Sequence, residues 1–111
     1  MNKAENLLKI IEEMRKFDSQ IEAHAVAIFF FVAMEENRDG IAMQSIAEKL
    51  DIAQSSVSRN AYKLGEINRH KKTGIGLLEA YRDPMERRRK LVRLTAKGKR
   101  VHNTLIDLIG N

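Results

Sequence analysis

The side chains best suited to chemistry gather in the segment 51–67, DIAQSSVSRNAYKLGEI. Its serine, arginine and lysine side chains all donate hydrogen bonds. If residues 54–67 form a helix that advances about 100° per residue, Val57, Ala61 and Leu64 share an inward face. Arg59 then lies on the opposite face, and arginine is the side chain suited to bidentate hydrogen bonding to guanine. The segment could therefore read DNA, although an ordinary solvated helix face can look similar.

The outward face around Arg59 collects further donors and no acidic residue. Its side chains could reach base edges or phosphates if the helix enters the major groove of DNA. The candidate contacts from this helix are Gln54, Ser55, Ser56, Arg59, Tyr62 and Lys63.

A second cationic cluster lies in RDPMERRRKLVRLTAKGKR, residues 82–100. Strand-forming residues on both sides of PMERR predict a hairpin with a long basic tip, where the proline removes no ladder hydrogen bond. Arg87, Arg88 and Arg89 at this tip could enter a minor groove, whose negative potential attracts arginine. Glu86 among them could hold one arginine in place or merely offset charge.

Charge is distributed unevenly along the 111 residues, whose formal net charge is +5. Residues 54–102 contain 14 Lys or Arg against four acidic residues, a balance of +10 that leaves −5 for the rest of the chain. One strongly basic section in a small domain is typical of a protein that binds a polyanion. A merely solubilising surface usually mixes both signs, as residues 1–22 do.

Other chemistries have little support in the sequence. The chain has no cysteine, which excludes disulfides and thiolate zinc sites and suits a reducing cytosol. His24, His70 and His102 lie far apart, and none has a second ligand at metal spacing. Neither a phosphate-binding glycine loop nor a Ser-His-Asp arrangement is present. We therefore expect a cytoplasmic protein that is not an enzyme and needs no metal or cofactor.

Helical periodicity organises the elements that must position these side chains. Residues 4–17 form one amphipathic pattern, and the pair Ser19 and Glu22 predicts a capping box for a second helix that runs through about Glu36. The apolar run at 25–34 within it is too short for a membrane, which takes about 20 residues, and is expected to be buried.

The pair of helices expected over residues 43–50 and 54–67 fits a helix-turn-helix. Ala47 is small where the two helices would cross, and Asp51 tolerates the left-handed backbone that such a turn often needs. Many helical hairpins share these intervals, so the basic hairpin that follows strengthens the DNA-binding interpretation. Thr95 can then cap a last helix.

Five residues at the basic tip and its exit have a specific spacing. They are Glu86, Arg88, Leu94, Thr95 and Gly98. With Glu in place of Asp, this spacing resembles the Asp-x-Arg, five residues, Leu-Thr-x-x-Gly pattern of the MarR-type winged helix-turn-helix regulators. The stretches DP at 83–84 and SSVSR at 55–59 also look like that family, and the resemblance covers about residues 20–100.

The resemblance implies a recognition helix that uses Ser55, Ser56, Ser58 and Arg59, and a wing that uses Arg88, with Arg87 and Arg89 beside it. Family members are usually homodimers that bind pseudo-palindromic promoter DNA and repress transcription, and many release DNA when they sense a small ligand or an oxidant. This chain departs from the pattern at Glu86 and at Asn60, which lies near the inward face and should bond locally or edge toward DNA.

The family also closes with long C-terminal helices, whereas this chain ends about fifteen residues after Thr95. A family-like pocket for a small-molecule effector is therefore doubtful. The first and last helices, 1–18 and 95–111, would supply most of a dimer interface, although their apolar stripes could instead pack within one subunit. The candidate interface residues are Leu7, Ile10, Ile11, Met14, Leu105, Ile106 and Ile109.

These observations together predict one domain over residues 1–111, of mainly α, α+β winged-helix class. It should have five helices and a two-stranded antiparallel β-ribbon wing between helices 4 and 5. We expect a homodimeric transcriptional regulator, most simply a repressor, whose partner is double-stranded DNA. The alternatives are a replication, partition or architectural DNA-binding protein, and a protein–protein adaptor, against which the +10 section argues.

Overall fold

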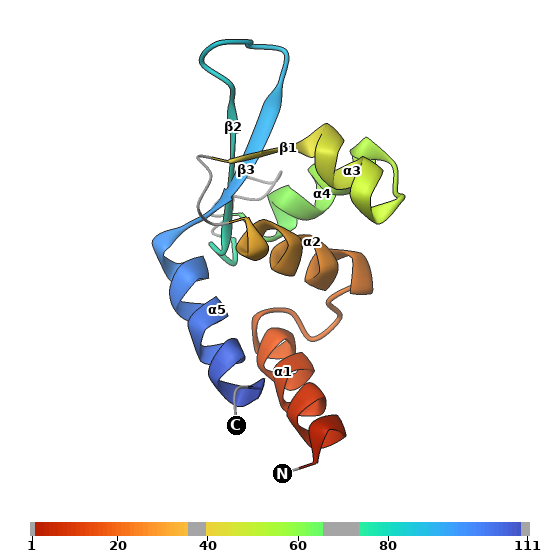
Figure 1. Cartoon of the computed structure of the whole chain (residues 1–111), viewed down its shortest axis with the longest axis vertical. Helices are drawn as coiled ribbons and strands as arrows, with labels where there is room; N and C mark the ends of the chain where they lie inside the picture. Colours follow the sequence, from red (N-terminus) through yellow and green to blue (C-terminus); the bar gives the residue numbers. More distant parts are fainter. Residues whose placement is uncertain (1, 36–39, 66–73, 110–111) are drawn as a thin grey trace.

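The computed structural model describes residues 2–35, 40–65 and 74–109 of the chain. Five helices and a small sheet make up these residues, as the sequence predicts for an α+β winged helix. The elements are α1 (Lys3–Phe17), α2 (Ala23–Met34), β1 (Ile41–Ala42), α3 (Met43–Leu50), α4 (Gln54–Lys63), β2 (Leu78–Arg82), β3 (Lys90–Leu94) and α5 (Ala96–Ile109). In Figure 1, α1 and α5 lie side by side at one end, and the β2–β3 ribbon projects at the other.

The sheet has three antiparallel strands in the order β1-β3-β2, one more than the sequence predicts. The β2–β3 ribbon pairs Leu78 with Leu94 and Arg82 with Lys90, and β1 pairs Ile41 with Val92. A two-residue strand has no alternation to detect, so only its pairing in the folded chain reveals it. This pairing anchors the start of α3 to the middle of the ribbon, where Val92 also pairs with Ala80.

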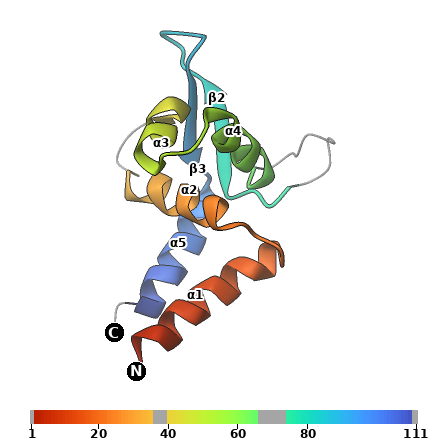
Figure 2. The same ribbon diagram turned by 90° about the vertical axis from the view of Figure 1, so that its right-hand side faces the viewer.

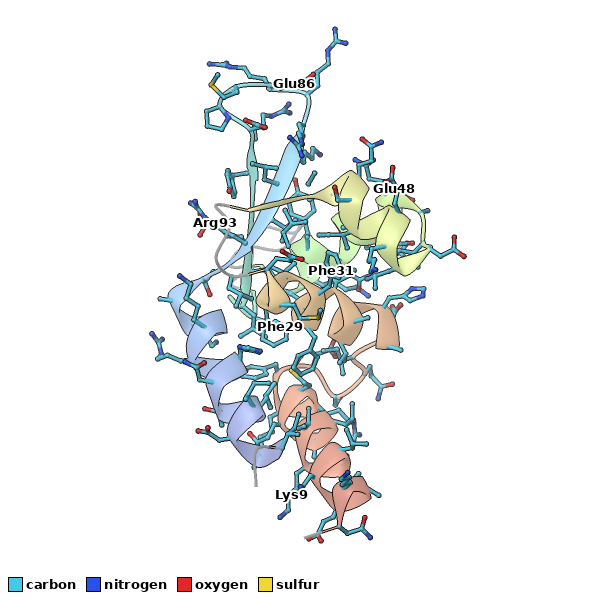
Figure 3. The ribbon with its side chains drawn as sticks, viewed as in Figure 1. Lys9, Phe29, Phe31, Glu48, Glu86 and Arg93 are labelled. Carbon is cyan, nitrogen blue, oxygen red and sulfur yellow. The ribbon has the colours of Figure 1, made fainter. Side chains whose placement is uncertain are left out.

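The core lies where α2 meets the sheet and the other helices. Phe29 and Ile28 of α2 are fully buried, together with Val57 of α4, Val92 of β3 and Leu105 of α5. Figure 3 shows Phe29 in the interior of the molecule and Glu86 at the far end of the ribbon. Most of the apolar run of α2 is therefore core, as expected, although Met34 at its end is 76% exposed. No helix in the described parts of the chain has the length and apolarity to span a bilayer.

The capping box predicted at Ser19 is wrong. Helix α2 begins at Ala23, and its N-cap residue is Glu22, whose side chain makes no capping hydrogen bond. Asp18 forms a turn here instead, because its Oδ1 accepts a hydrogen bond from the Gln20 N–H at 3.0 Å and its carbonyl accepts one from Ile21 at 3.0 Å. A side chain that bonds its own local backbone competes with a helix start.

Two helix ends differ from the prediction in part. Helix α2 ends at Met34 and α4 at Lys63, earlier than the expected Glu36 and Ile67. Both predicted ends lie outside the described residues. Helix α3 has the predicted bounds, because its apolar residues and its turn are unambiguous in the sequence.

Thr95 caps α5 as predicted and also joins it to the segment that precedes β2. The Thr95 Oγ1 accepts a hydrogen bond from the Gly98 N–H at 2.9 Å and donates one to the Gly76 carbonyl oxygen at 2.6 Å. At Gly98 the helix passes so close to the chain before β2 that a Cβ would collide with the Leu77 carbonyl oxygen. The spacing of Thr95 and Gly98 thus fixes how α5 leaves the sheet.

Candidate nucleic-acid interface

The turn between α3 and α4 has the geometry that the sequence predicts. Asp51 adopts the left-handed conformation, with φ 53° and ψ 51°, and is the one non-glycine residue with positive φ among those described. The Ile52 N–H donates to the Ala47 carbonyl oxygen at 3.0 Å, which closes the turn against the end of α3. This sharp turn sets the direction in which α4 leaves α3 (Figure 2).

The two faces of α4 separate as expected. Val57, Ala61 and Leu64 are buried in the core. Ser55 and Arg59 are exposed on the other side, and so are the Gln54, Tyr62 and Lys63 side chains. Ser56 and Ser58 are half-buried on the flanks. The helix thus presents a donor-rich strip around Arg59 to solvent.

Asn60 takes the first of the two roles the sequence allows. It is fully buried, and its Nδ2 donates to the Ser56 carbonyl oxygen one turn earlier at 2.9 Å. Its Oδ1 is buried without a hydrogen-bond partner. Asn60 therefore bonds within α4 and does not lie on the outward strip.

Lys63 is held by an acid that the sequence does not bring near it. Its Nζ donates to the Glu22 Oε1 at 3.1 Å, across 41 positions of the chain. The hydrogen bond and charge of Lys63 lower the pKa of the Glu22 carboxyl below its ordinary value of 4.5, and Arg59 adds a weaker attraction. Glu22 is thus ionised at neutral pH and orients the last turn of α4.

The tip of the ribbon, residues 83–89, is closed by its own hydrogen bonds. The Asp83 N–H donates to the Arg89 carbonyl oxygen at 2.9 Å, and the Arg89 N–H donates to the Glu86 carbonyl oxygen at 2.9 Å. The Asp83 Oδ1 also accepts from the Met85 N–H at 2.9 Å. The tip is therefore an ordered turn, and its arginines extend from a defined backbone.

Arg87, Arg88 and Arg89 are all exposed at this tip. The ion pair here joins the Arg89 Nη1 to the Asp83 Oδ2 at 3.7 Å, so the acid that holds an arginine is Asp83 and not Glu86. The prediction that Glu86 could hold one arginine in place is therefore wrong, because Asp83 has that role. Asp83 had no such role in the sequence interpretation because the turn that brings it to Arg89 is visible only in the fold.

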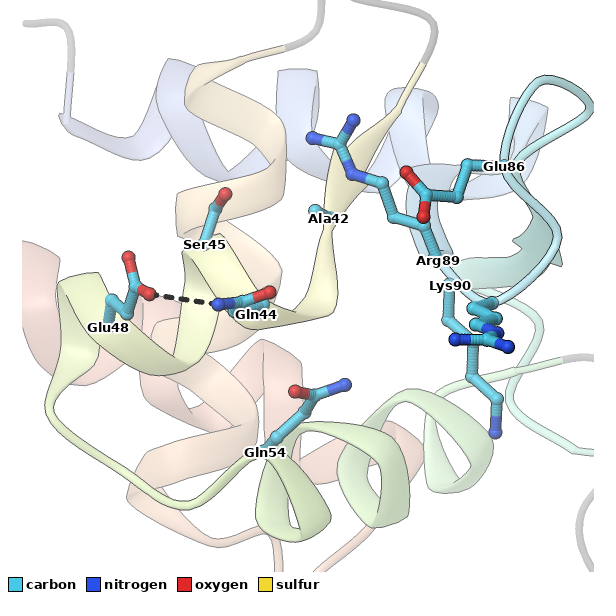
Figure 4. A pocket seen from close by; sticks show the side chains of 9 residues that line it. Ala42, Gln44, Ser45, Glu48, Gln54, Glu86, Arg89 and Lys90 are labelled. Atoms are coloured by element: carbon cyan, nitrogen blue, oxygen red, sulfur yellow. Dashed lines mark hydrogen bonds between the residues drawn. The ribbon is translucent and has the colours of Figure 1, made fainter.

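The start of α4 and the ribbon tip line one groove, whose volume is about 430 Å³. In Figure 4, Gln44 and Ser45 of α3 face Glu86, Arg89 and Lys90 of the ribbon. The complete lining comprises Ala42, Gln44, Ser45, Glu48, Gln54, Glu86, Arg88, Arg89 and Lys90. Elements about thirty residues apart in the sequence thus form one surface.

Four polar residues of this groove, Gln44, Ser45, Glu48 and Lys90, were not among the site residues predicted from the sequence. Gln44 and Ser45 are exposed on the first turn of α3, and Lys90 opens β3. Gln44 donates from its Nε2 to the Glu48 Oε1 at 3.3 Å, so its amide is oriented along α3. The helical periodicity of 43–50 already places Gln44 and Ser45 on the outward face, but only the fold shows that this face borders the wing.

The residues assigned to a dimer interface divide into two sets. Ile10, Met14 and Leu105 are buried in the core of the single chain, which is the alternative the sequence left open. They are corrected to core residues, because α1 and α5 pack on each other. The exposed set comprises Leu7, Ile11, Ile106 and Ile109, at 60%, 41%, 43% and 49% exposure.

The histidines and acids of the described residues offer no metal site, since no three of them cluster. His24 is exposed, and His102 lies edge-on to Phe29 and Phe30, with centroid separations of 6.4 and 6.2 Å. His70 lies outside the described residues.

Comparisons with known proteins agree with this geometry. The family model of the winged helix DNA-binding domain matches residues 22–98. The PcaV transcriptional regulator of Streptomyces coelicolor, solved with its natural ligand, is 25% identical over 96% of this chain and 70% of its own, with a TM-score of 0.63.

Two further solved structures share the fold. The MepR–DNA complex of S. aureus is 20% identical over 96% of this chain and 78% of its own, with a TM-score of 0.72. MarR is 18% identical over 97% of this chain and 75% of its own, with a TM-score of 0.61. No curated protein sequence matches the chain significantly.

Proposed function

Because the chain belongs to the winged helix DNA-binding domain family and has the fold of MarR-type transcription regulators, we propose that it binds a specific pseudo-palindromic DNA site as a homodimer and represses transcription there. In this proposal α4 is the recognition helix and the β2–β3 ribbon is the wing. The target lies in the cytoplasm, and the chemistry is binding and not catalysis.

The observation that supports the proposal most is the shared surface of α4 and the wing. Gln54 at the start of α4 and Arg88 at the ribbon tip line the same groove. A recognition helix placed in the major groove would carry the ribbon toward the adjoining minor groove, where arginine is attracted by the negative potential. In Figure 2, α4 lies beside the β2–β3 ribbon.

Roles within the surface follow from side-chain chemistry. Arg59 is exposed on α4 and is proposed to contact a guanine through its paired donors. Ser55, Ser56 and Gln54 supply shorter donors for bases or phosphates near the start of the helix. Ser58, Tyr62 and Lys63 are proposed as flanking contacts, with Arg87, Arg88 and Arg89 neutralising phosphates or entering the minor groove.

A homodimer would set the distance between two copies of this DNA-binding surface. Leu7 and Ile11 of α1 and Ile106 and Ile109 of α5 leave apolar side chains exposed at the end of the molecule away from the wing (Figure 1). Pairing two chains there would direct two recognition helices to the same side of a duplex, with half-sites about 34 Å apart. A protein bound across a promoter in this way blocks access to it, which is the basis for proposing repression.

One experiment tests the proposal directly. Duplexes bound by the full chain are selected from random DNA, the winning sequence is footprinted, and a promoter containing it is placed before a reporter. The proposal expects one protected pseudo-palindrome and lower reporter output when the protein is present. Uniform coating of any duplex would indicate an architectural protein, and loss of all DNA affinity at physiological salt would indicate a protein adaptor.

A further inference from the structure

The apex of the wing carries apolar side chains that the proposed DNA contacts leave unexplained. Pro84 and Met85 follow Asp83, and Met85 is 93% exposed, the highest value among the large apolar side chains of the described residues. Single exposed apolar residues are common on protein surfaces. This one differs because of how it is held and what surrounds it.

Met85 is presented by an ordered turn. Its N–H donates to the Asp83 Oδ1 at 2.9 Å, and the Asp83 Oδ2 lies 3.7 Å from the Arg89 Nη1. Pro84 fixes one backbone angle beside it. The Arg82 Nη1 also donates to the Arg87 carbonyl oxygen at 3.1 Å, which ties the two arms of the tip together. Little backbone entropy is therefore lost when this apex enters a partner.

The chemistry around the apex is that of a groove with anionic walls. Arg87 and Arg88 follow Met85 within three positions and are exposed, so their guanidinium groups can contact phosphates beside the thioether. The minor groove has phosphates along both walls and the polar edges of the base pairs at its floor, while the stacked faces of the bases are apolar. Proteins that enter it commonly insert an apolar side chain between base pairs there, with cationic side chains alongside.

We propose that Met85 is a wedge that enters between two base pairs in the minor groove, unstacks that step and bends the bound DNA. The inference rests on the proposed function, because the wing must first reach the groove. Pyrimidine–purine steps are the easiest to unstack, so Met85 selects for such a step at the outer ends of the DNA site. Met85 thereby adds specificity by deformation at positions that α4 does not touch.

The test uses the full chain and the duplex recovered by selection, with 2-aminopurine placed at the step under the wing. Binding is followed by anisotropy, unstacking by 2-aminopurine fluorescence, and bending by energy transfer between dyes at the duplex ends. Met85→Ala removes the wedge, Met85→Leu keeps a large apolar side chain, and Met34→Ala is the matched control, since Met34 is 76% exposed at the end of α2.

The wild type, Met85→Leu and Met34→Ala should all raise the fluorescence and bend the duplex, whereas Met85→Ala should bind within about tenfold of wild type and lose both signals. A wild type that binds without either signal, or a Met85→Ala protein that keeps both, would overturn the wedge and leave the regulator function standing. A wild type that binds no duplex would contradict the function and the wedge together.

Discussion

Lys63 at the end of α4 and Glu22 at the N-cap of α2 form an ion pair in which Nζ and Oε1 lie 3.1 Å apart. The pair ties the proposed recognition helix to the helix beneath it. It also occupies a lysine that could otherwise neutralise a phosphate. Glu22 is therefore an acid beside the proposed interface, and its charge opposes the DNA backbone.

Glu22→Gln should strengthen binding to any duplex by a few-fold at low salt, because Lys63 is released and one negative charge is lost. Glu12→Gln is the matched control: it removes an acid paired with Arg15 at 2.8 Å on α1, away from α4, and should change affinity less. Titration of both variants by fluorescence anisotropy distinguishes them. Equal DNA affinities of the two variants would show that Lys63 does not contact the DNA.

The same pair makes the stability of the protein weakly dependent on pH. Lys63 lowers the pKa of Glu22 below 4.5, so the pair contributes stability above the ordinary pKa and loses that contribution as the pH falls through the lowered value. At pH 7 the Glu22 carboxyl is ionised and can pair with Lys63. Wild type should therefore lose slightly more stability than Glu22→Gln between pH 6 and pH 3, as measured by urea unfolding at a series of pH values.

Arg59→Ala should reduce discrimination between the selected site and random DNA by about 1–3 kcal/mol, because the paired donors to guanine are lost. Arg59→Lys keeps the charge and loses the planar fork, so it should retain most non-specific affinity and lose most of the discrimination. Competition of labelled site against unlabelled random duplex measures the ratio. An unchanged ratio in both variants would remove Arg59 from base recognition.

Arg88→Ala should weaken binding to all duplexes similarly and reduce the slope of log affinity against log salt by about 1, because one phosphate contact is lost. Arg15→Ala, which removes the same charge from α1, should leave the slope unchanged. Affinities measured over a range of salt concentrations give both slopes. A wing that does not contact DNA would leave Arg88→Ala and Arg15→Ala indistinguishable.

The fold was largely predictable because its decisive signals are local. The inward face of α4 follows from helical periodicity, and the left-handed turn at Asp51 follows from the residue type. The Thr95 cap and the presence of the hairpin likewise follow from residues close together in the sequence. Each of these features needs only a few adjacent residues to specify it.

The site was less predictable because the contacts between its residues depend on how the folded chain packs. The sequence offered Glu86 as the acid for a wing arginine, but the turn at the tip gives that position to Asp83. Two features of the fold were missed as well: strand β1 is too short to have a pattern, and a local turn made by Asp18 replaces the capping box predicted at Ser19. That Gln44 borders the wing depends on how α3 sits on the ribbon.

Gly98→Ala should destabilise the chain by about 1–3 kcal/mol, although alanine normally favours a helix over glycine. The new Cβ would meet the Leu77 backbone, which cannot move without disturbing the hydrogen bond from the Thr95 N–H to the Leu77 carbonyl oxygen at 3.1 Å. Asn103→Ala, at an exposed position of the same helix, should stabilise by up to about 0.5 kcal/mol. Urea unfolding followed by circular dichroism tests the opposite signs.

Ile106→Glu should shift the protein from dimer to monomer, because it places a charge in the exposed apolar set on α1 and α5 that is proposed to pair two chains. The side chain is 43% exposed, so the monomer should stay folded. Met34→Glu places the same charge at an exposed apolar position of α2 and should leave the dimer intact. Sedimentation velocity measures the mass, and the monomeric variant should bind one half-site but lose the cooperative affinity for the full pseudo-palindrome. A wild type that sediments as a monomer at micromolar concentration, or an Ile106→Glu variant that remains dimeric, would show that this apolar set does not join the two chains.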